Sequence, residues 1–286
     1  MSVLLSLLLL LAAPPGAVDP KGDELIGAPG VHVIAPGESL IEIARLYDVG
    51  FNEIAAANPN LDPYIPTAGA IALVPTAWIL PRAAAPGTVV VNLSEMRLYF
   101  IPGAGRPPIT FPVGVAVEPH ATPLGVLRII EKSVAPTWYP TPAILEEDPT
   151  LPAVVPPGPE NPLGSHALRL SSRTILIHGT NRPFGVGRKV SHGCIRLYPD
   201  DIRRLFRLVE IGTPVAIVRE PVKVGLRQGR IYVEIHEDES VAVDPVREAV
   251  RLIAERGVLR DVDPRKLAGA IRASRGIPVN VTAVRE

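Results

Sequence analysis

Thirty-three prolines are spread along the 286 residues of the chain rather than gathered in one tract. This share is about twice the average proline content of about 5%. Each proline fixes its own φ angle and donates no backbone hydrogen bond, so it limits the helix or strand around it. The sequence therefore predicts many fixed turns rather than a disordered tail.

The charge balance and the size of the chain set broad limits on its function. Lys plus Arg and Asp plus Glu each number 29, so the formal net charge is zero and no basic field exists to attract nucleic acid or anionic lipid. Nucleic-acid binding is therefore not expected. With 286 residues, of which 47% are hydrophobic, the chain is large enough for at least two domains.

The first residues form a short apolar run that ends in small residues and two prolines. Residues 1–17 are predicted to be a secretory signal peptide, because the run is shorter than the roughly 20 residues that cross a bilayer. A buried N-terminal helix is the alternative. No later segment is apolar enough to cross a membrane, so we expect a protein of the periplasm or cell envelope with no transmembrane segment after signal cleavage.

Residues 31–76 predict a small strand-helix-helix-strand unit. Ser39 and Glu42 form a capping box before an apolar helical pattern, which marks a helix start. A second helix is expected at residues 52–57 and must end there, because Asn-Pro-Asn follows. A Gly/Pro-rich spacer is expected up to about Gly30, before this unit. One short strand is expected after the spacer and before these helices, and another at residues 71–75.

This unit resembles a LysM module. The resemblance depends on Val-Ile-Ala-Pro-Gly-Glu-Ser-Leu at residues 33–40, Ala-Asn-Pro-Asn-Leu at residues 57–61 and the closing Ile-Ala-Leu-Val-Pro. It implies binding to the N-acetylglucosamine-containing glycan strands of peptidoglycan. A small helical spacer domain without a binding site is the alternative.

Residues 87–219 contain many short candidate strands and few helical stretches. Residues 89–92 and 97–100 flank a tight turn at Ser94 and Glu95, as in a β-hairpin. Further strands are expected at residues 110–115, 125–131, 167–170 and 174–178. This close spacing predicts a compact domain resembling a β-sandwich or barrel.

The remaining segments add helices and one long loop to a fold that is mostly β with some α. The proline-rich loop at residues 136–164 is longer than most loops, so it is a candidate groove wall or lid. A helix is expected to begin at Pro199, with acidic residues in its first turn. Residues 220–286 are predicted to form a C-terminal α+β appendage, with a hairpin-like stretch and helices at about 245–256 and 264–275.

Cys194 is the only cysteine, so an intramolecular disulfide is impossible and the thiol must be explained by burial or reactivity. A cysteine attacks an acyl group as a thiolate, which needs a base or a positive neighbour. His178, at a strand end, can supply that base, and a backbone carbonyl such as that of Gly179 can hold its useful tautomer. We therefore predict Cys194 as a nucleophile, with a thiol pKa below the ordinary value of about 8.5.

The residues around Cys194 suit the binding of an acyl substrate. Gly193 lets the chain come close, so the N–H groups of Gly193 and Cys194 can point at a developing oxyanion. Arg196 can hold a substrate carboxylate through two parallel hydrogen bonds. An ordinary surface ion pair is the alternative role for Arg196.

Other interpretations of these residues lead to different functions. Cys194 could be an inert buried side chain, but its glycine and polar neighbours are unusual in a core. His178, His192 and Cys194 could bind zinc, but no fourth ligand stands at a recognisable spacing, so no metal is expected. His192 could be a second base or could shape the loop, and loop shaping is favoured. No role is assigned to the other four histidines.

Two segments, Ile-Leu-Ile-His-Gly-Thr at residues 175–180 and Ser-His-Gly-Cys-Ile-Arg-Leu at residues 191–197, resemble the L,D-transpeptidase catalytic domain, the YkuD family. The resemblance covers roughly residues 87–219. It implies a triad of Cys194, His178 and the Gly179 carbonyl, with Ser191, His192 and Arg196 in the substrate cleft. With the LysM-like unit, the chain is most similar to a periplasmic subgroup that includes enzymes attaching murein lipoprotein to peptidoglycan.

The resemblance implies an L,D-transpeptidase that needs no cofactor. Its cysteine would form a thioester at the bond between diaminopimelate and D-alanine in a tetrapeptide stem of peptidoglycan, and an amine would then take the acyl group. A diaminopimelate side chain as acceptor would give a 3→3 cross-link, a lysine of an outer-membrane lipoprotein would give protein attachment, and a free D-amino acid would give exchange. Carbapenems are expected to acylate the same thiol. An L,D-carboxypeptidase, with water as acceptor, and a non-catalytic LysM wall-binding protein are the alternatives.

Overall fold

The computed structural model describes residues 23–103, 105–118, 120–172 and 174–284. The predicted signal peptide at residues 1–17 lies outside the described residues. The described chain is mostly β with some α, as predicted, and its strands form one large sheet and four small ones. No helix in this part of the chain is long and apolar enough to cross a membrane.

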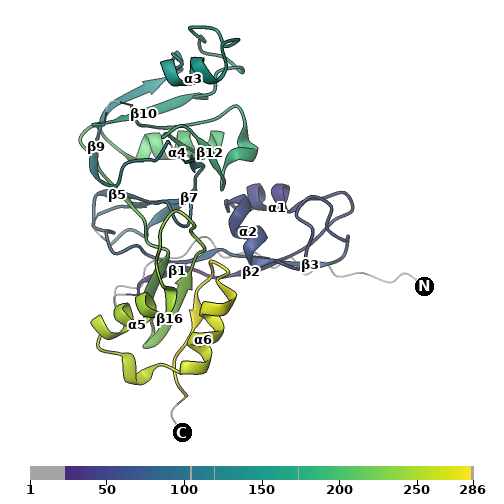
Figure 1. Cartoon of the computed structure of the whole chain (residues 1–286), viewed down its shortest axis with the longest axis vertical. Coiled ribbons are helices and arrows are strands. Elements are labelled where there is room, and N and C mark those ends of the chain that lie inside the picture. The colour runs from purple at the N-terminus through teal and green to yellow at the C-terminus, as the bar shows by residue number, and fades with distance from the viewer. Residues whose placement is uncertain (1–22, 104, 119, 173, 285–286) are drawn as a thin grey trace.

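A small βααβ unit follows the N-terminal segment (Figure 1). Its elements are β2 (Gly30–Val33), α1 (Leu40–Leu46), α2 (Phe51–Ala57) and β3 (Ile71–Val74). Strands β2 and β3 pair in antiparallel fashion. Helix α1 begins at the predicted capping box, where the Ser39 N–H donates to the Glu42 carboxylate at 2.8 Å. The predicted order of strands and helices is confirmed.

The large sheet has eight strands in the order β13-β11-β10-β9-β14-β5-β6-β7. Its neighbours are antiparallel except for the pairs β11–β13 and β5–β14, which are parallel. The strands are β5 (Thr88–Asn92), β6 (Arg97–Ile101), β7 (Ile109–Pro112), β9 (Gly125–Val134), β10 (His166–Leu170), β11 (Leu176–His178), β13 (Ile195–Arg196) and β14 (Pro214–Val218). The predicted hairpin at its start is the antiparallel pair of β5 and β6.

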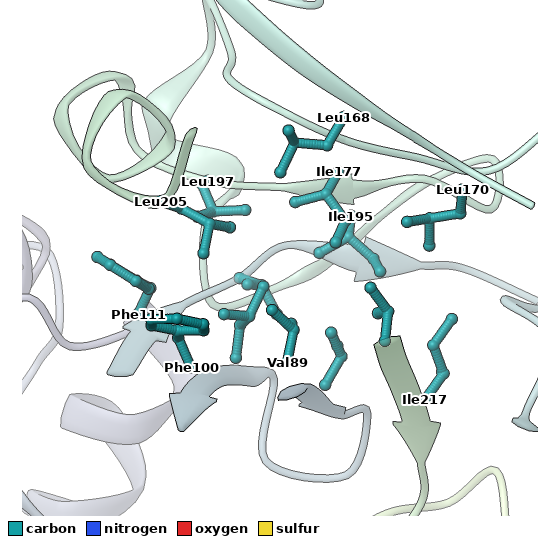
Figure 2. Packing of buried hydrophobic residues seen from close by; sticks show 14 of the residues in the cluster. Val89, Phe100, Phe111, Leu168, Leu170, Ile177, Ile195, Leu197, Leu205 and Ile217 are labelled. Atoms are coloured by element: carbon teal, nitrogen blue, oxygen red, sulfur yellow. The ribbon is translucent and has the colours of Figure 1, made fainter. Parts of the chain in front are cut away.

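The sheet curls around one hydrophobic core. Figure 2 shows apolar side chains from both ends of the sheet, such as Phe111 of β7 and Ile195 of β13, in the same cluster. Helix α4 (Pro199–Leu208), which begins at the predicted proline, adds the fully buried Ile202 and Leu205. Each large apolar side chain buried in this way contributes roughly 1.5–3 kcal/mol to stability. The compact β domain predicted from the sequence is therefore one curled sheet around its own core.

The βααβ unit packs on the outer face of the same sheet. Val89 and Val91 of β5 enter the core inside the sheet, whereas Val90 packs with the apolar residues of the βααβ unit. Fully buried Arg97 of β6 donates to the carboxylate of Glu53 in α2, at 2.6 Å from Nη2 and 2.8 Å from Nε. The βααβ unit and the sheet therefore share a hydrophobic core and a buried ion pair.

Residues 220–286 include a third hydrophobic core, with helices beside a small sheet. Strands β15 and β16 form the predicted hairpin, and β17 pairs with β16. The two helices expected from the sequence are both present (Figure 1). The elements are β15 (Val222–Arg227), β16 (Arg230–Ile235), α5 (Pro245–Glu255), the 3-10 turn η2 (Leu259–Asp261), α6 (Pro264–Ala273) and β17 (Val279–Asn280).

Two short strands disagree with the sequence analysis, which expects only a spacer before Gly30. Strand β1 (Leu25–Gly27) lies in that spacer and pairs with β4 (Ala77–Ile79). Such short strands have no readable alternation, and their partners hold them in place. The Glu24 N–H donates to the Leu226 carbonyl at 2.9 Å, in the C-terminal hairpin. The spacer prediction is therefore wrong for these residues.

Candidate active site

The two predicted catalytic side chains lie on neighbouring strands. His178 is the last residue of β11, and Cys194 stands immediately before β13. These strands run parallel, with Ile177 beside Ile195 and His178 beside Arg196. Because side chains alternate along a strand, the two isoleucines enter the core, and Cys194, Arg196 and His178 belong to the opposite face. The pairing of β11 and β13 thus places Cys194, His178 and Arg196 on one face at this edge of the large sheet.

His178 is buried and held in one tautomer. Its Nδ1 lies 2.6 Å from the carbonyl oxygen of Gly179, so Nδ1 donates and Nε2 remains an acceptor in the neutral ring. Burial lowers the pKa of His178 to about 4, and the charge of Arg196 acts in the same direction, while hydrogen bonds to the Gly179 and Leu163 carbonyls partly offset them. The imidazole is therefore neutral near pH 7, as a general base must be.

Two glycines allow the chain to pack tightly beside His178. Gly164 has a φ of +67°, and a Cβ there would lie 2.7 Å from the backbone nitrogen of Thr180. A Cβ on Gly179 would lie 3.0 Å from Cγ2 of Ile202, in helix α4. The C-terminal end of the 136–164 loop is therefore pressed against the segment that carries the imidazole and its carbonyl partner.

The loop before Cys194, residues 191–194, is held by side chains on both sides; we refer to it as the nucleophile loop. The buried Ser191 hydroxyl donates to the carbonyl of Cys194 at 2.5 Å. Gly193 has a φ of +109°, a conformation that favours glycine, and its carbonyl accepts from the hydroxyl of Thr122 at 2.9 Å. Ser191 therefore supports the shape of this loop from inside the protein.

The thiol of Cys194 is partly exposed, and its sulfur lies 3.7 Å from the Thr174 carbonyl oxygen. Burial raises the pKa of this thiol, although a backbone hydrogen bond at Leu176 and the charges of Arg196 and Arg169 oppose the shift. The lowered thiol pKa predicted from the sequence is wrong, because desolvation outweighs the positive neighbours. The Cys194 thiol and the His178 imidazole are therefore both neutral near pH 7.

Arg196 has an unsatisfied donor in the site. Its backbone N–H donates to the Gly114 carbonyl at 2.9 Å, and its carbonyl accepts from the Gly114 N–H at 2.8 Å. The side-chain Nε is buried and has no hydrogen-bond partner within the described residues. A buried guanidinium N–H without a partner is costly, so an arriving anion would relieve that cost.

The 136–164 loop, predicted as a groove wall or lid, has a fixed base and a short helix. The backbones of Trp138 and Val155 exchange two hydrogen bonds of 2.9 Å. The buried Asn161 side chain donates to the carbonyls of Pro136, Val155 and Pro156. Helix α3 (Pro142–Glu147) lies in the segment between Trp138 and Val155, whose ends these hydrogen bonds hold together. Asn161 has no sequence signal of its own, because its role depends on carbonyls brought together by the fold.

His192 contacts helix α3 of this loop. Its Nε2 lies 2.7 Å from a carboxylate oxygen of Glu147, and Nε2 of His120 lies 3.1 Å from the other oxygen. The zinc set considered from the sequence, His178 with His192 and Cys194, is not among the ligand clusters found in the described residues. His120 and Glu147 were not predicted as site residues, because they lie 72 and 45 positions before His192 in a sequence that does not reveal their contact.

A buried neutral imidazole, a thiol and a guanidinium on one sheet edge are the components of a cysteine–histidine acyl-transfer site. Residues 86–217 match the L,D-transpeptidase catalytic domain, and residues 32–70 match the LysM domain. Both matches fall where the sequence resemblances were found.

Two curated proteins are similar along most of the chain. Probable L,D-transpeptidase YcfS of Escherichia coli K12 is 38% identical, over 92% of this chain and 86% of its own length. Probable L,D-transpeptidase ErfK/SrfK of Salmonella typhimurium is 36% identical, over 93% of this chain and 90% of its own length. Among solved structures, the catalytic domain of the Enterococcus faecium L,D-transpeptidase is 20% identical, over 48% of this chain and 99% of its own, with a TM-score of 0.38. The chain belongs to the L,D-transpeptidase family.

Proposed function

We propose that Cys194 is the acyl-accepting nucleophile of an L,D-transpeptidase and that His178 is its base. The observation that supports this most directly is the 2.6 Å contact between His178 Nδ1 and the Gly179 carbonyl, on the strand beside Cys194. With Nδ1 donating to that carbonyl, Nε2 of the neutral ring is the nitrogen that can accept the thiol proton. The Gly179 carbonyl is the third member of the proposed triad.

The proposed reaction has two acyl-transfer steps. The sulfur of Cys194 bonds to the carbonyl carbon of diaminopimelate in a tetrapeptide stem as its proton moves to His178. The C–N bond to D-alanine then breaks, His178 returns the proton to the departing amine, and a thioester remains. An acceptor amine attacks that thioester, forms the new amide and returns the proton to the thiol. No cofactor enters this scheme.

The neutral resting pair fits a step in which proton transfer accompanies attack. Burial keeps His178 neutral and also disfavours the thiolate of Cys194. A thiol that ionises only when the substrate carbonyl is in place avoids exposure of a thiolate between turnovers. The N–H groups of Gly193 and Cys194 are proposed to stabilise the oxyanion, because the positive φ of Gly193 sets the direction of the backbone there.

Arg196 is proposed to bind a carboxylate of the stem peptide. Its buried Nε without a partner supports this role, because carboxylates match the guanidinium fork. Ser191 and His192 are proposed to complete the cleft by shaping the nucleophile loop. Ser191 does so through its hydrogen bond to the Cys194 carbonyl, and His192 does so through its contact with Glu147.

The LysM match supports a place for the protein at the cell wall. We propose that residues 31–76 bind the glycan strands of peptidoglycan. Residues 87–219 are proposed to carry out catalysis in the periplasm, and residues 220–286 are proposed to stabilise the large sheet. Weak binding by one LysM module would raise the local concentration of the site at its substrate. The acceptor amine is either a diaminopimelate side chain or a lysine of an outer-membrane lipoprotein.

D-Alanine release from a disaccharide-tetrapeptide tests the proposed chemistry. Wild-type protein is expected to release D-alanine, and Cys194→Ala is not. Mass spectrometry of the products then separates the reactions: a cross-linked dimer indicates a transpeptidase, and a tripeptide alone indicates an L,D-carboxypeptidase. Binding to wall sacculi without D-alanine release would leave only a wall-binding protein.

A further inference from the structure

Three side chains from separate parts of the chain meet at the edge of the candidate site. His120 lies in the loop between β8 (Val115–Ala116) and β9, Glu147 ends helix α3, and His192 lies two residues before Cys194. One ligand atom from each of the three lies within 4.8 Å of the other two. The imidazole ring centroids are 4.7 Å apart, with 48° between the ring planes.

We propose that His120, Glu147 and His192 form a binding site for a divalent transition-metal ion such as Zn²⁺. Two imidazoles and one carboxylate are a donor set that Zn²⁺ commonly takes, with a fourth position open to water. Bonds of about 2.0–2.1 Å in a tetrahedron place neighbouring ligand atoms roughly 3.3 Å apart. One carboxylate oxygen of Glu147 lies 2.7 Å from His192 Nε2, and the other oxygen lies 3.1 Å from His120 Nε2, so each contact is close to that spacing.

The two histidines are held in place by the backbone around them. Strand β8 pairs in parallel with β12 (Lys189–Ser191), so the chain segments that lead to the two rings run side by side. The Val117 N–H donates to the Ser191 carbonyl at 2.9 Å, and Thr122 bonds to the Gly193 carbonyl. A site whose ligands are already positioned binds its ion with less ordering cost.

The third ligand belongs to a helix with little other attachment. Helix α3, labelled in Figure 1, contains no buried residue. Its last residue, Glu147, contacts both histidines. The side chains of all three residues are partly exposed, so an ion and water can reach them. A bound ion would therefore fasten α3 to the nucleophile loop and narrow the approach to Cys194.

Calorimetric titration with Zn²⁺ tests the site in full-length Cys194→Ser protein, which removes the competing thiol. We expect one ion to bind. Adding Glu147→Gln to this protein should weaken binding by more than about tenfold. The neighbouring Glu146→Gln is the matched control, because both carboxylates are exposed on the same helix and only Glu147 meets the histidines. His120→Ala provides a second loss variant, and circular dichroism checks its folding.

Three outcomes would overturn the proposed site. These are no Zn²⁺ binding to Cys194→Ser, binding that requires the thiol, or equal binding by Glu147→Gln and Glu146→Gln. Hydrogen exchange tests whether a bound ion holds α3 to the nucleophile loop. Zn²⁺ should slow backbone hydrogen exchange in residues 142–147 of the Cys194→Ser protein. Unchanged exchange in the zinc-bound protein would contradict the role assigned to α3.

The expected effect of Zn²⁺ on activity rests on the proposed function, so it is tested in a separate experiment. Zn²⁺ should slow D-alanine release by the wild type and have much less effect on His120→Ala. Equal inhibition of both proteins would place the inhibiting ion on the thiol and contradict the narrowing by α3. If no D-alanine is released even without metal, the proposed function fails, and the calorimetric result still decides the metal site.

Discussion

The ammonium of Lys223 donates to the carboxylate of Glu95 at 2.6 Å, with both side chains at most 1% exposed. Lys223 lies in β15, and Glu95 lies in the turn between β5 and β6. Lys223 also meets Glu234 of β16 at 2.9 Å and the carbonyl of Ile79 in β4 at 2.6 Å. One buried cation thus joins the C-terminal unit, the large sheet and the β1–β4 pair.

This cation is charged in the folded protein despite its burial. Burial alone would lower the pKa of Lys223, but the charges of Glu234 and Glu95 outweigh it and hold the pKa above its ordinary value. Lys223→Met should therefore leave the buried carboxylates of Glu95 and Glu234 without their ammonium partner. We expect a loss of roughly 3–5 kcal/mol in the free energy of unfolding, measured with urea.

An exposed ion pair supplies the control for that experiment. Arg203→Ala removes a surface partner of Asp200 and should change the free energy of unfolding by less than about 1 kcal/mol. If Lys223→Met is as mild as Arg203→Ala, the buried cluster does not hold the three parts together.

Asp201 should make stability depend on pH. Burial, with the nearby Asp48 charge acting in the same direction, raises the pKa of Asp201 to about 8, and its Oδ2 has no hydrogen-bond partner in the described residues. The unfolded value is about 3.9, so between about pH 4 and pH 8 the folded state holds a proton that the unfolded state has lost. The contribution is fully present below about pH 4 and is lost as the pH rises through 8.

The variant Asp201→Asn removes this titration. It should be more stable than the wild type at pH 8.5 by at least about 1.4 kcal/mol, the value of one pKa unit, with little difference at pH 4. Urea unfolding at the two pH values measures the difference. A constant offset at both would show that Asp201 is charged throughout or pairs with an unseen partner.

Gly193→Ala should impair the site more than the fold. The φ of Gly193 is +109°, which an alanine rarely adopts, and the new methyl group would press on Ile175 Cδ1 at 3.3 Å. D-Alanine release should fall by at least about tenfold, because the N–H groups at the thiol would turn. Gly103→Ala is the control, since a Cβ there meets nothing within 4 Å. Equal rates for the two variants would remove Gly193 from the oxyanion role.

Arg196→Lys tests recognition of a carboxylate. Lysine keeps the charge but replaces the planar fork with a point donor, so kcat/KM should fall by about tenfold or more. Steady-state D-alanine release from tetrapeptide substrate measures this effect. An unaltered rate would assign Arg196 a structural role instead.

Much of the fold was predictable because its signals are local. The capping box at Ser39 and Glu42, the hairpin around Ser94 and the helix starting at Pro199 each lie within a few residues of sequence. The curling of the sheet was predicted only as a class, because the strand order depends on contacts between distant segments. The β1–β4 pair was missed for the same reason, since three residues become a strand only beside their partner.

The candidate site divides in a similar way. His178 and Cys194 stand in recognisable segments, and the Gly179 carbonyl lies where the residues suggested. The direction of the Cys194 pKa was not predictable, because it depends on how deeply the fold buries the sulfur. Likewise, Glu147 is one exposed glutamate among many in the sequence, and only the path of the long loop places it between two histidines.

Acylation of the single thiol tests the central claim most directly. Intact-mass measurement after incubation with a carbapenem should show one drug-sized increment on the wild type and none on Cys194→Ser, because no other cysteine exists. His178→Ala should slow acylation far more than His192→Ala, since His178 is the proposed base. An unmodified wild type, an increment on Cys194→Ser, or the reverse order of the two histidine variants would contradict the account.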